Sequence, residues 1–192
     1  MRRNPARRAA LLDAAIEVLA REGSRGLTLR AIDAEAGVPT GTATNYFADR
    51  ADLLTQVMHR TRERLTPDPE ALAETMRQAP THALATELMR QLLGRMRADR
   101  TGYLAMLELR LEATRRPELH TELSGFLTAE LGENIRYHLD AGLPGDATDV
   151  VLLYFAMIGL LLDDLTIPAI TEPYATDDLI EKLVTRLLPD GD

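Results

Sequence analysis

The stretch "LTLRAIDAEAGVPTGTATNYFADRADLL", residues 27–54, contains the signals for two short helices separated by a tight turn. Thr28 is a favourable N-cap for a helix over Leu29 to Ala36. Gly37 suits the end of that helix, because glycine readily adopts the left-handed conformation. Pro39 can occupy the first turn of a further short helix that runs to about Phe47. These signals predict a helix-turn-helix.

Helical patterns continue on both sides of this stretch. Residues 7–21 carry an apolar stripe, and Gly23 and Gly26 are expected to close that first helix. Asp49 is expected to cap a helix that begins at Arg50. The later helices are predicted over 69–78, 81–98, 101–115, 118–141, 147–165 and 176–188.

No segment shows sustained period-two alternation, so we expect an all-α fold of about nine to ten helices. We predict a DNA-binding head over residues 1–48 and a larger helical bundle over residues 49–192. The helix from about residue 50 would connect the two parts.

Composition excludes several classes of protein. The chain is 45% hydrophobic and 27% charged, as soluble globular proteins are, and it has no cysteine for disulfides, thiolate metal sites or cysteine nucleophiles. The longest apolar run, Val150 to Leu162, is too short to span a bilayer. The N-terminus, MRRNPARR, lacks an apolar signal-type segment, so we expect a cytoplasmic protein.

Charge is distributed unevenly. Residues 1–50 carry eight Arg against six acidic residues, whereas the whole chain has a formal net charge of −8. Four of the basic residues lie at the very start: Arg2, Arg3, Arg7 and Arg8. This asymmetry favours an anionic partner for the N-terminal part, although a solvated terminus would give the same pattern.

Residues 27–54 resemble the helix-turn-helix of the TetR family of bacterial transcriptional regulators. The resemblance rests on Thr28, Leu29-Arg30, Ile32, Ala36-Gly37-Val38, Gly41-Thr42, Tyr46-Phe47 and Leu53-Leu54. It covers about the first 54 residues specifically, and the remainder only in being helical. Membership implies operator DNA, a small-molecule effector and a second copy of the chain as partners. It implies no enzymatic activity, no cofactor and no membrane partner.

The resemblance also implies which residues contact DNA. Asn45 could make a bidentate contact to adenine, and Arg50 should pair with a phosphate. Tyr46 is expected at the phosphate backbone, whereas Phe47 is expected to pack inside the head. The predicted DNA-contacting residues are Thr28, Thr40, Gly41, Thr42, Thr44, Asn45, Tyr46, Arg50, Arg7 and Arg8. For each of them, a solvated or capping role is the alternative.

Some residues depart from the family pattern. Asp33 replaces a small apolar residue, commonly Ala, and Ala43 replaces Leu or Ile. Thr44 replaces Tyr, and Arg50 replaces Lys with the charge kept. Asp33 should either point outward or reduce the stability of the head. These departures keep a second class open, a helical ligand-binding or protein-interaction module whose head does not read DNA specifically.

The family resemblance implies a ligand pocket and a dimer interface in the body. The pocket is expected at Met89, Leu92, Leu93, Met96, Tyr103, Met106, Leu107 and Arg110, although Met and Leu at helical spacing are also ordinary core. The interface is expected at Leu123, Phe126, Leu127, Leu131, Leu152, Phe155 and Gly159. The segment after Asp149 is apolar around nearly its whole circumference, so either a second chain or the chain's own core must cover it.

Catalysis finds no support in the sequence. The four histidines are scattered and none has metal-ligand spacing, so we expect no metal site. The most economical interpretation is a ligand-responsive transcriptional repressor. It would bind a pseudo-palindromic operator as a homodimer and leave that DNA when a small molecule binds.

Overall fold

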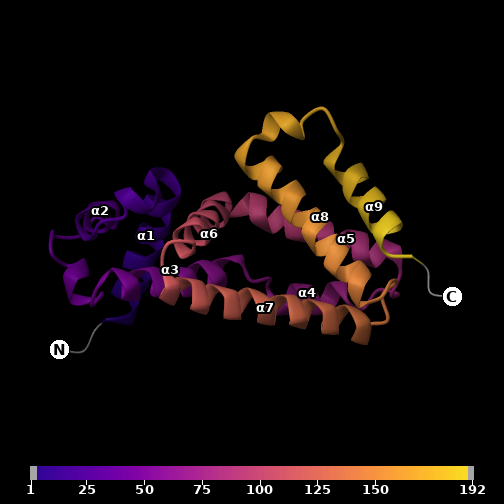
Figure 1. The fold of residues 1–192 in the computed structure, drawn as a ribbon, viewed down its shortest axis with the longest axis horizontal. Helices are drawn as coiled ribbons and strands as arrows, with labels where there is room; N and C mark the ends of the chain where they lie inside the picture. Colours follow the sequence, from indigo (N-terminus) through magenta and orange to yellow (C-terminus); the bar gives the residue numbers. More distant parts are fainter. Residues whose placement is uncertain (1–3, 190–192) are drawn as a thin grey trace. The chain divides into compact units, whose positions relative to one another are not determined.

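The computed structural model describes residues 4–189, and within that range the chain is helical and has no strand (Figure 1). In order, the helices are α1 (Pro5–Gly26), α2 (Leu29–Glu35), the short 3-10 helix η1 (Ala43–Asn45), α3 (Arg50–Leu65), α4 (Pro69–Thr75), α5 (His82–Ala98), α6 (Arg100–Ala113), α7 (Pro117–Asp140), α8 (Ala147–Thr166), the 3-10 helix η2 (Pro168–Ile170) and α9 (Thr176–Leu187). The expected all-α class is confirmed.

Side-chain caps fix most helix starts where the sequence places them. The Thr28 hydroxyl accepts the N–H of Ala31, and the Asp49 carboxylate accepts that of Asp52. Asp68 caps α4 in the same way, with Pro69 as the first helical residue. Each cap satisfies an N–H that has no partner within its helix, which is why these boundaries could be predicted.

The first helix is longer than its apolar stripe suggested. Asn4 caps it and Pro5 is its first residue, so Arg7 and Arg8 lie on an exposed helical turn. Gly23 has φ +68° and kinks α1 before one further turn. The predicted stop is therefore a bend, which only glycine accommodates without strain.

The predicted third helix over Pro39 to Phe47 is wrong in extent. Only Ala43–Asn45 is helical, as a single 3-10 turn. Gly41 has φ +91°, which is outside the helical region, so the chain before it cannot join the turn as a continuous helix.

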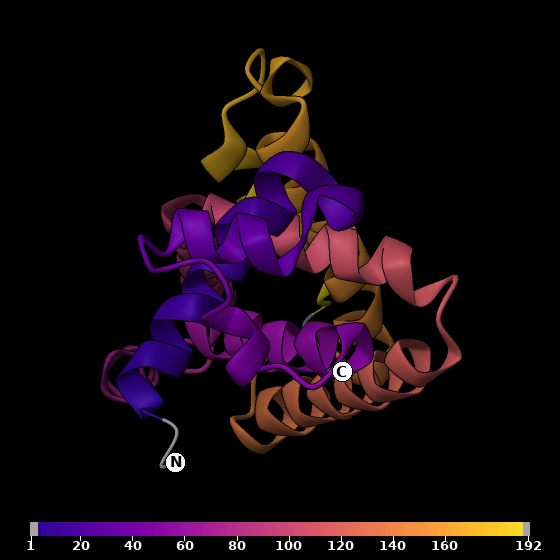
Figure 2. The ribbon, with the colours of Figure 1, turned by 90° about the vertical axis from the view of Figure 1, so that its left-hand side faces the viewer.

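Two compact packing units make up the chain. The first contains the residues up to Thr66 together with Asp99–Phe126. In it, α6 packs against α1 and α3, and α2 packs against α1 (Figure 2). Its core includes Leu11, Ile16, Leu19, Ile32, Phe47, Leu54 and Leu109. Packing therefore differs from the expected division at residue 48, because α6 belongs with the helix-turn-helix.

The second unit contains Pro67–Ala98 together with the residues from Leu127 onward. In it, α5 packs against α8 and α9. Its buried residues include Leu84, Leu93, Leu153, Met157, Ile180 and Val184. The amide of Gln91 donates to the hydroxyl of Thr75 at 3.0 Å, which attaches α4 to α5.

The apolar run Val150 to Leu162 lies within α8. Across residues 4–189, no helix combines the length and the apolar character needed to cross a membrane.

Candidate nucleic-acid interface

A tight turn joins α2 to the segment that follows it. Gly37 has φ +62°, its N–H bonds to the carbonyl of Ala34, and the N–H of Val38 bonds to the carbonyl of Asp33. This pair of bonds is a Schellman motif, which satisfies carbonyls that the end of a helix leaves open. The predicted role of Gly37 as the left-handed residue of the turn is confirmed.

Asp33 links α2 to the segment after the turn. Its side chain is 2% exposed, so it points inward. One carboxylate oxygen accepts the N–H of Gly41 at 2.6 Å, and the other accepts the N–H of Ala43 at 2.7 Å. A carboxylate at the start of a helical turn is favoured both by these bonds and by the turn dipole.

Ala43 is the second residue that this carboxylate holds. Its backbone N–H donates to Asp33, and its side chain is completely buried. A Leu or Ile would add volume at this fully buried position. The two departures from the family pattern therefore belong together. Asp33 therefore does not point outward, and its carboxylate accepts two hydrogen bonds; its effect on the stability of the head stays a prediction.

The segment Thr40–Asn45 presents short polar side chains to solvent. Thr40, Gly41, Thr44 and Asn45 are exposed, and Thr42 is partly exposed. The Thr42 hydroxyl donates to the carbonyl of Pro39 at 2.5 Å, and the Asn45 amide donates to that of Gly41 at 3.2 Å. These bonds orient both side chains without burying them.

The two aromatic residues that end the segment differ in burial. Phe47 is 3% exposed and is part of the core of the first unit, as predicted. Tyr46 is partly exposed, and its backbone N–H bonds to the carbonyl of Ala43. The position of Tyr46 is compatible with the predicted contact to the DNA backbone, which stays a prediction.

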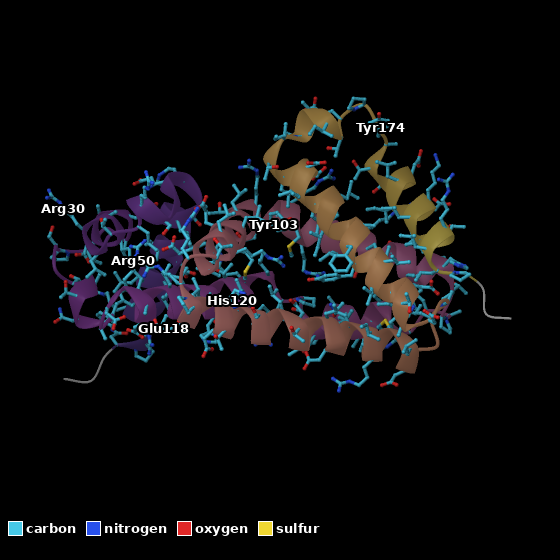
Figure 3. The ribbon with its side chains drawn as sticks, in the orientation of Figure 1. Arg30, Arg50, Tyr103, Glu118, His120 and Tyr174 are labelled. Atoms are coloured by element: carbon cyan, nitrogen blue, oxygen red, sulfur yellow. The ribbon has the colours of Figure 1, made fainter. Side chains whose placement is uncertain are left out.

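Arg50 has partners within the head. Its guanidinium donates to the carbonyl of Leu27 at 2.8 Å, to the hydroxyl of Ser24 at 2.8 Å and also to the carbonyl of Ser24. Figure 3 shows Arg50 among the helices of the head, whereas Arg30 projects outward from α2. Arg50 thus satisfies one carbonyl in the last turn of α1 and one directly after that helix, and its predicted phosphate contact stays untested.

Arg30 is a candidate that the residue-level prediction missed. It lies in the first turn of α2, is exposed, and has no carboxylate in ion-pair range among residues 4–189. The first helix of a helix-turn-helix crosses the DNA backbone, so a cation there is suited to a phosphate. In the sequence, the signal for this role was a basic residue in the first turn of the predicted helix.

The remaining basic candidates lie at the N-terminus. Arg7 and Arg8 are exposed on α1, and Arg8 donates to the Gln56 side chain at 2.9 Å. Arg2 and Arg3 lie outside the described residues. Thr28 is exposed and its hydroxyl oxygen already caps α2, as an N-cap that faces a phosphate would.

An ion pair and a hydrogen bond tie α3 and α1 to α6 and to its N-cap residue, Asp99. Arg64 near the end of α3 contacts both carboxylate oxygens of Asp99, with 2.8 Å between Nε and Oδ2. Burial alone would raise the pKa of Asp99, but the bonds from Arg64 and from the Gly102 N–H outweigh it and hold that pKa below its usual value. Farther along α6, the carboxylate of Glu108 accepts the N–H of Ser24 at 3.4 Å.

The expected pocket residues divide between the two units. Met89, Leu92, Leu93 and Met96 lie on α5 of the second unit, whereas Tyr103, Met106, Leu107 and Arg110 lie on α6 of the first. Leu93 and Met96 are buried, and the other six are partly exposed. Burial raises the pKa of the Tyr103 hydroxyl, and Arg110 partly offsets this. A shallow surface depression on α9 includes none of these residues.

The residues expected at the dimer interface differ in how exposed they are in the single chain. Phe155 is 61% exposed and Leu152 is 49% exposed on α8, and a Cβ added to Gly159 would meet no other atom. Leu127 and Leu131 are partly exposed on α7. Leu123 is only 4% exposed in the single chain, and its expected place in the interface stays a prediction. Phe126 has the Arg62 guanidinium 4.6 Å from its ring centroid.

An all-helical chain with this head is a helix-turn-helix protein, and comparison with known proteins identifies its family. Residues 11–57 match the bacterial regulatory proteins of the tetR family, and residues 80–190 match the tetracyclin repressor-like C-terminal domain. The chain belongs to the TetR family of bacterial transcriptional regulators. The predicted resemblance is confirmed, and it extends into the body.

Solved structures agree with this assignment. The multidrug binding protein EbrR complexed with imidazole is 31% identical, with 98% of each chain covered and a TM-score of 0.68. EbrR complexed with ethidium is 32% identical, with 95% of this chain and 99% of that chain covered and a TM-score of 0.64. A TetR-family member from Streptomyces coelicolor A3 is 30% identical, with 96% and 99% covered and a TM-score of 0.69. A search of curated proteins finds no match.

Proposed function

We propose that this regulator is a homodimeric repressor that binds operator DNA through Thr40–Asn45 and leaves it when a small molecule binds. The observation that carries the DNA-binding half of the proposal is the Asp33 carboxylate, which holds an exposed polar segment at the start of η1. Short hydroxyl and amide side chains on a rigid support are suited to base edges in the major groove.

Within this segment, Asn45 is the side chain that can read adenine with two bonds. Thr42 and Thr44 offer hydroxyls and methyl groups to neighbouring bases, and exposed Gly41 allows the backbone to approach closely. Arg30 and the first turn of α1 would supply phosphate contacts, which add affinity without sequence preference. Base contacts and phosphate contacts are thus assigned to different elements of the head.

A second copy of the chain is needed for the operator contacts proposed. Leu152 and Phe155 are exposed apolar residues on α8, and no other atom lies within 4 Å of where a Cβ of Gly159 would be. This face is suited to close helix packing across a two-fold axis. Two heads about 34–36 Å apart would enter successive major grooves on one face of the duplex. A ligand that favours another spacing of the heads lowers operator affinity by shifting the population.

The body is the proposed site of that ligand. EbrR is a multidrug binding protein whose structures include complexes with ethidium, proflavin and malachite green, and about 30% of its residues are identical to this chain. We therefore place the effector site in the helical body, beside the α5 residues Leu92 and Met96. The alternative is a helical module whose head does not read DNA specifically, and the operator-binding test distinguishes it from the repressor.

The test uses DNA from upstream of the protein's own gene and of its neighbours. We expect the wild type to protect one pseudo-palindromic segment from nuclease. Asn45→Ala should lower affinity for that segment by about 1–3 kcal/mol while affinity for unrelated DNA stays unchanged. Equal losses on both DNAs would remove Asn45 from base reading, and no protected segment would contradict the repressor proposal.

A further inference from the structure

Three arginines on α5 differ in what surrounds their charge. Arg97 makes a two-bond pair with Asp164 of α8, with 2.8 Å between Nε and Oδ2. Arg90 lies 3.6 Å from Glu181 and 3.9 Å from Asp177 of α9. Arg95 lies between them in sequence, and no carboxylate of residues 4–189 lies in ion-pair range of it.

Arg95 is nevertheless partly withdrawn from water. Its side chain is partly buried, and its Nε is a fully buried donor without a hydrogen-bond acceptor among the described residues. Burial lowers the pKa of the guanidinium, and no neighbouring charge acts on it. Arginine cannot shed its proton under ordinary conditions, so a buried arginine needs an anion.

The nearest acidic residues along the chain are already engaged. Asp99, four residues later, is held by Arg64 and by the N–H of Gly102. Glu87, two turns earlier on α5, accepts the side-chain amide of Gln91 at 2.9 Å. Within residues 4–189, the carboxylates on both sides of Arg95 in sequence thus have other partners, and none is in ion-pair range of Arg95.

Two apolar residues precede Arg95 on its side of α5, next to the polar Gln91 at i−4. Leu92 and Leu88 share its side of the helix at i−3 and i−7, and both are partly exposed. A site built from a guanidinium and such neighbours is suited to a molecule with a carboxylate at one end and a hydrocarbon body at the other.

We propose that the effector of this regulator is an amphipathic carboxylate, and that Arg95 binds its carboxylate while Leu88 and Leu92 contact its apolar part. This inference rests on the proposed function, which requires an effector in the body. It differs from the EbrR complexes, since ethidium and malachite green are organic cations.

The first experiment measures ligand binding to the full-length protein by thermal shift and calorimetry. The probes are aliphatic and aryl carboxylates, from acetate to dodecanoate and from benzoate to phenylbutyrate, each beside its neutral primary amide at constant ionic strength. We expect one or more carboxylates to bind at least tenfold more tightly than their amides. Arg95→Met should abolish that preference, and Arg186→Met, which removes an exposed cation on α9, should retain it.

The outcomes that overturn the proposal are definite. They are the absence of any carboxylate preference across the set, or the same preference in wild type and Arg95→Met. Operator binding by the wild type without carboxylates is measured in parallel. A failure there counts against the repressor proposal, whereas the carboxylate preference is read directly from binding.

A second readout does not depend on finding the effector. Without ligand, Arg95→Met should raise the unfolding midpoint, because it removes a buried cation that has no partner. Arg97→Met should lower the midpoint, because it leaves Asp164 unpaired. A lower midpoint for Arg95→Met, or a weakened dimer by light scattering, would show that the protein itself supplies the anion and would overturn the proposal.

Discussion

The carboxylate of Asp33 accepts the backbone N–H of Ala43, with 2.7 Å between Oδ1 and the nitrogen. Both residues are buried, and both depart from the family pattern of a small residue at 33 and a Leu or Ile at 43. The hydrogen bond joins the two departures: the Asp33 carboxylate anchors the turn that begins at Ala43, and the Ala43 side chain is small at a fully buried position.

Asp33→Ala should lower the free energy of unfolding by about 2–3 kcal/mol, because two N–H groups lose a charged acceptor. Ala43→Leu alone should cost about 1–3 kcal/mol through overpacking. The double variant restores the family pattern and should recover part of both losses, which a double-mutant cycle from urea unfolding measures. Strictly additive losses would contradict the coupling of the two positions.

Arg50→Ala should destabilise the head by about 1.5–3 kcal/mol, because the carbonyls of Ser24 and Leu27 lose a charged donor. Arg25→Ala is the control, since Arg25 is exposed at the end of α1. Chemical denaturation measures the change, and equal stability of the two variants would argue against the structural role. Salt titration of DNA binding by the folded variant would then detect any phosphate contact as a loss of about one unit of slope.

Arg30→Ala should weaken binding to every DNA sequence by a similar factor. The slope of log affinity against log salt should fall by about one unit, because one phosphate contact is lost. Arg77→Ala removes an exposed arginine of the second unit and serves as the control. An unchanged slope for Arg30→Ala would place this cation away from the DNA backbone.

Phe155→Glu should convert the dimer to monomers, because a charge on α8 would be buried in the proposed interface. Tyr174→Glu is a matched control, since both aromatic side chains are 61% exposed in the single chain. Light scattering coupled to gel filtration measures the mass. A dimer that survives Phe155→Glu but dissociates with Tyr174→Glu would place the interface near η2 and not on α8.

The pair Arg97–Asp164 should make stability depend on pH. The hydrogen bond from Arg97 holds the pKa of Asp164 below its usual value. The stabilisation is therefore complete above the unfolded pKa of about 4 and is lost as the pH falls through the lower folded pKa.

Arg97→Met should cost about 2 kcal/mol at pH 7, and less near pH 4, where the unpaired Asp164 can take up a proton. Arg77→Met breaks an exposed pair with Glu74 and should change little at either pH. Urea unfolding at the two pH values gives the comparison. An equal loss for Arg97→Met at both values would contradict the assigned role of Asp164.

Local signals predicted most of the fold. N-cap side chains such as those of Thr28, Asp49 and Asp68 accept a backbone N–H three residues later. Both partners are close in sequence, so these caps can be predicted from it. The left-handed turn at Gly37 was also predictable, because few other residues adopt it. The predicted function came from the resemblance to a family. The residue patterns alone predicted a helix-turn-helix but not what the protein does.

What sequence reasoning missed depends on contacts between distant residues. The role of Asp33 requires Gly41 and Ala43 to be folded back over it, and periodicity says nothing of that. The contacts of Arg50 could not be predicted for the same reason, because its acceptors Ser24 and Leu27 lie more than twenty residues earlier. The helix expected over Pro39 to Phe47 is shortened to η1 because Gly41 has a positive φ. A continuous helix that begins at Pro39 would not contain a residue in that conformation.

The membership of α6 in the first packing unit has a practical consequence for protein engineering. The chain passes between the two units three times, after Thr66, after Ala98 and after Phe126. A fragment cut at Thr66 would contain the whole helix-turn-helix yet would expose the face of α1 that α6 covers. Chimeras that exchange effector specificity should therefore carry Asp99–Phe126 along with the residues up to Thr66 of the same parent.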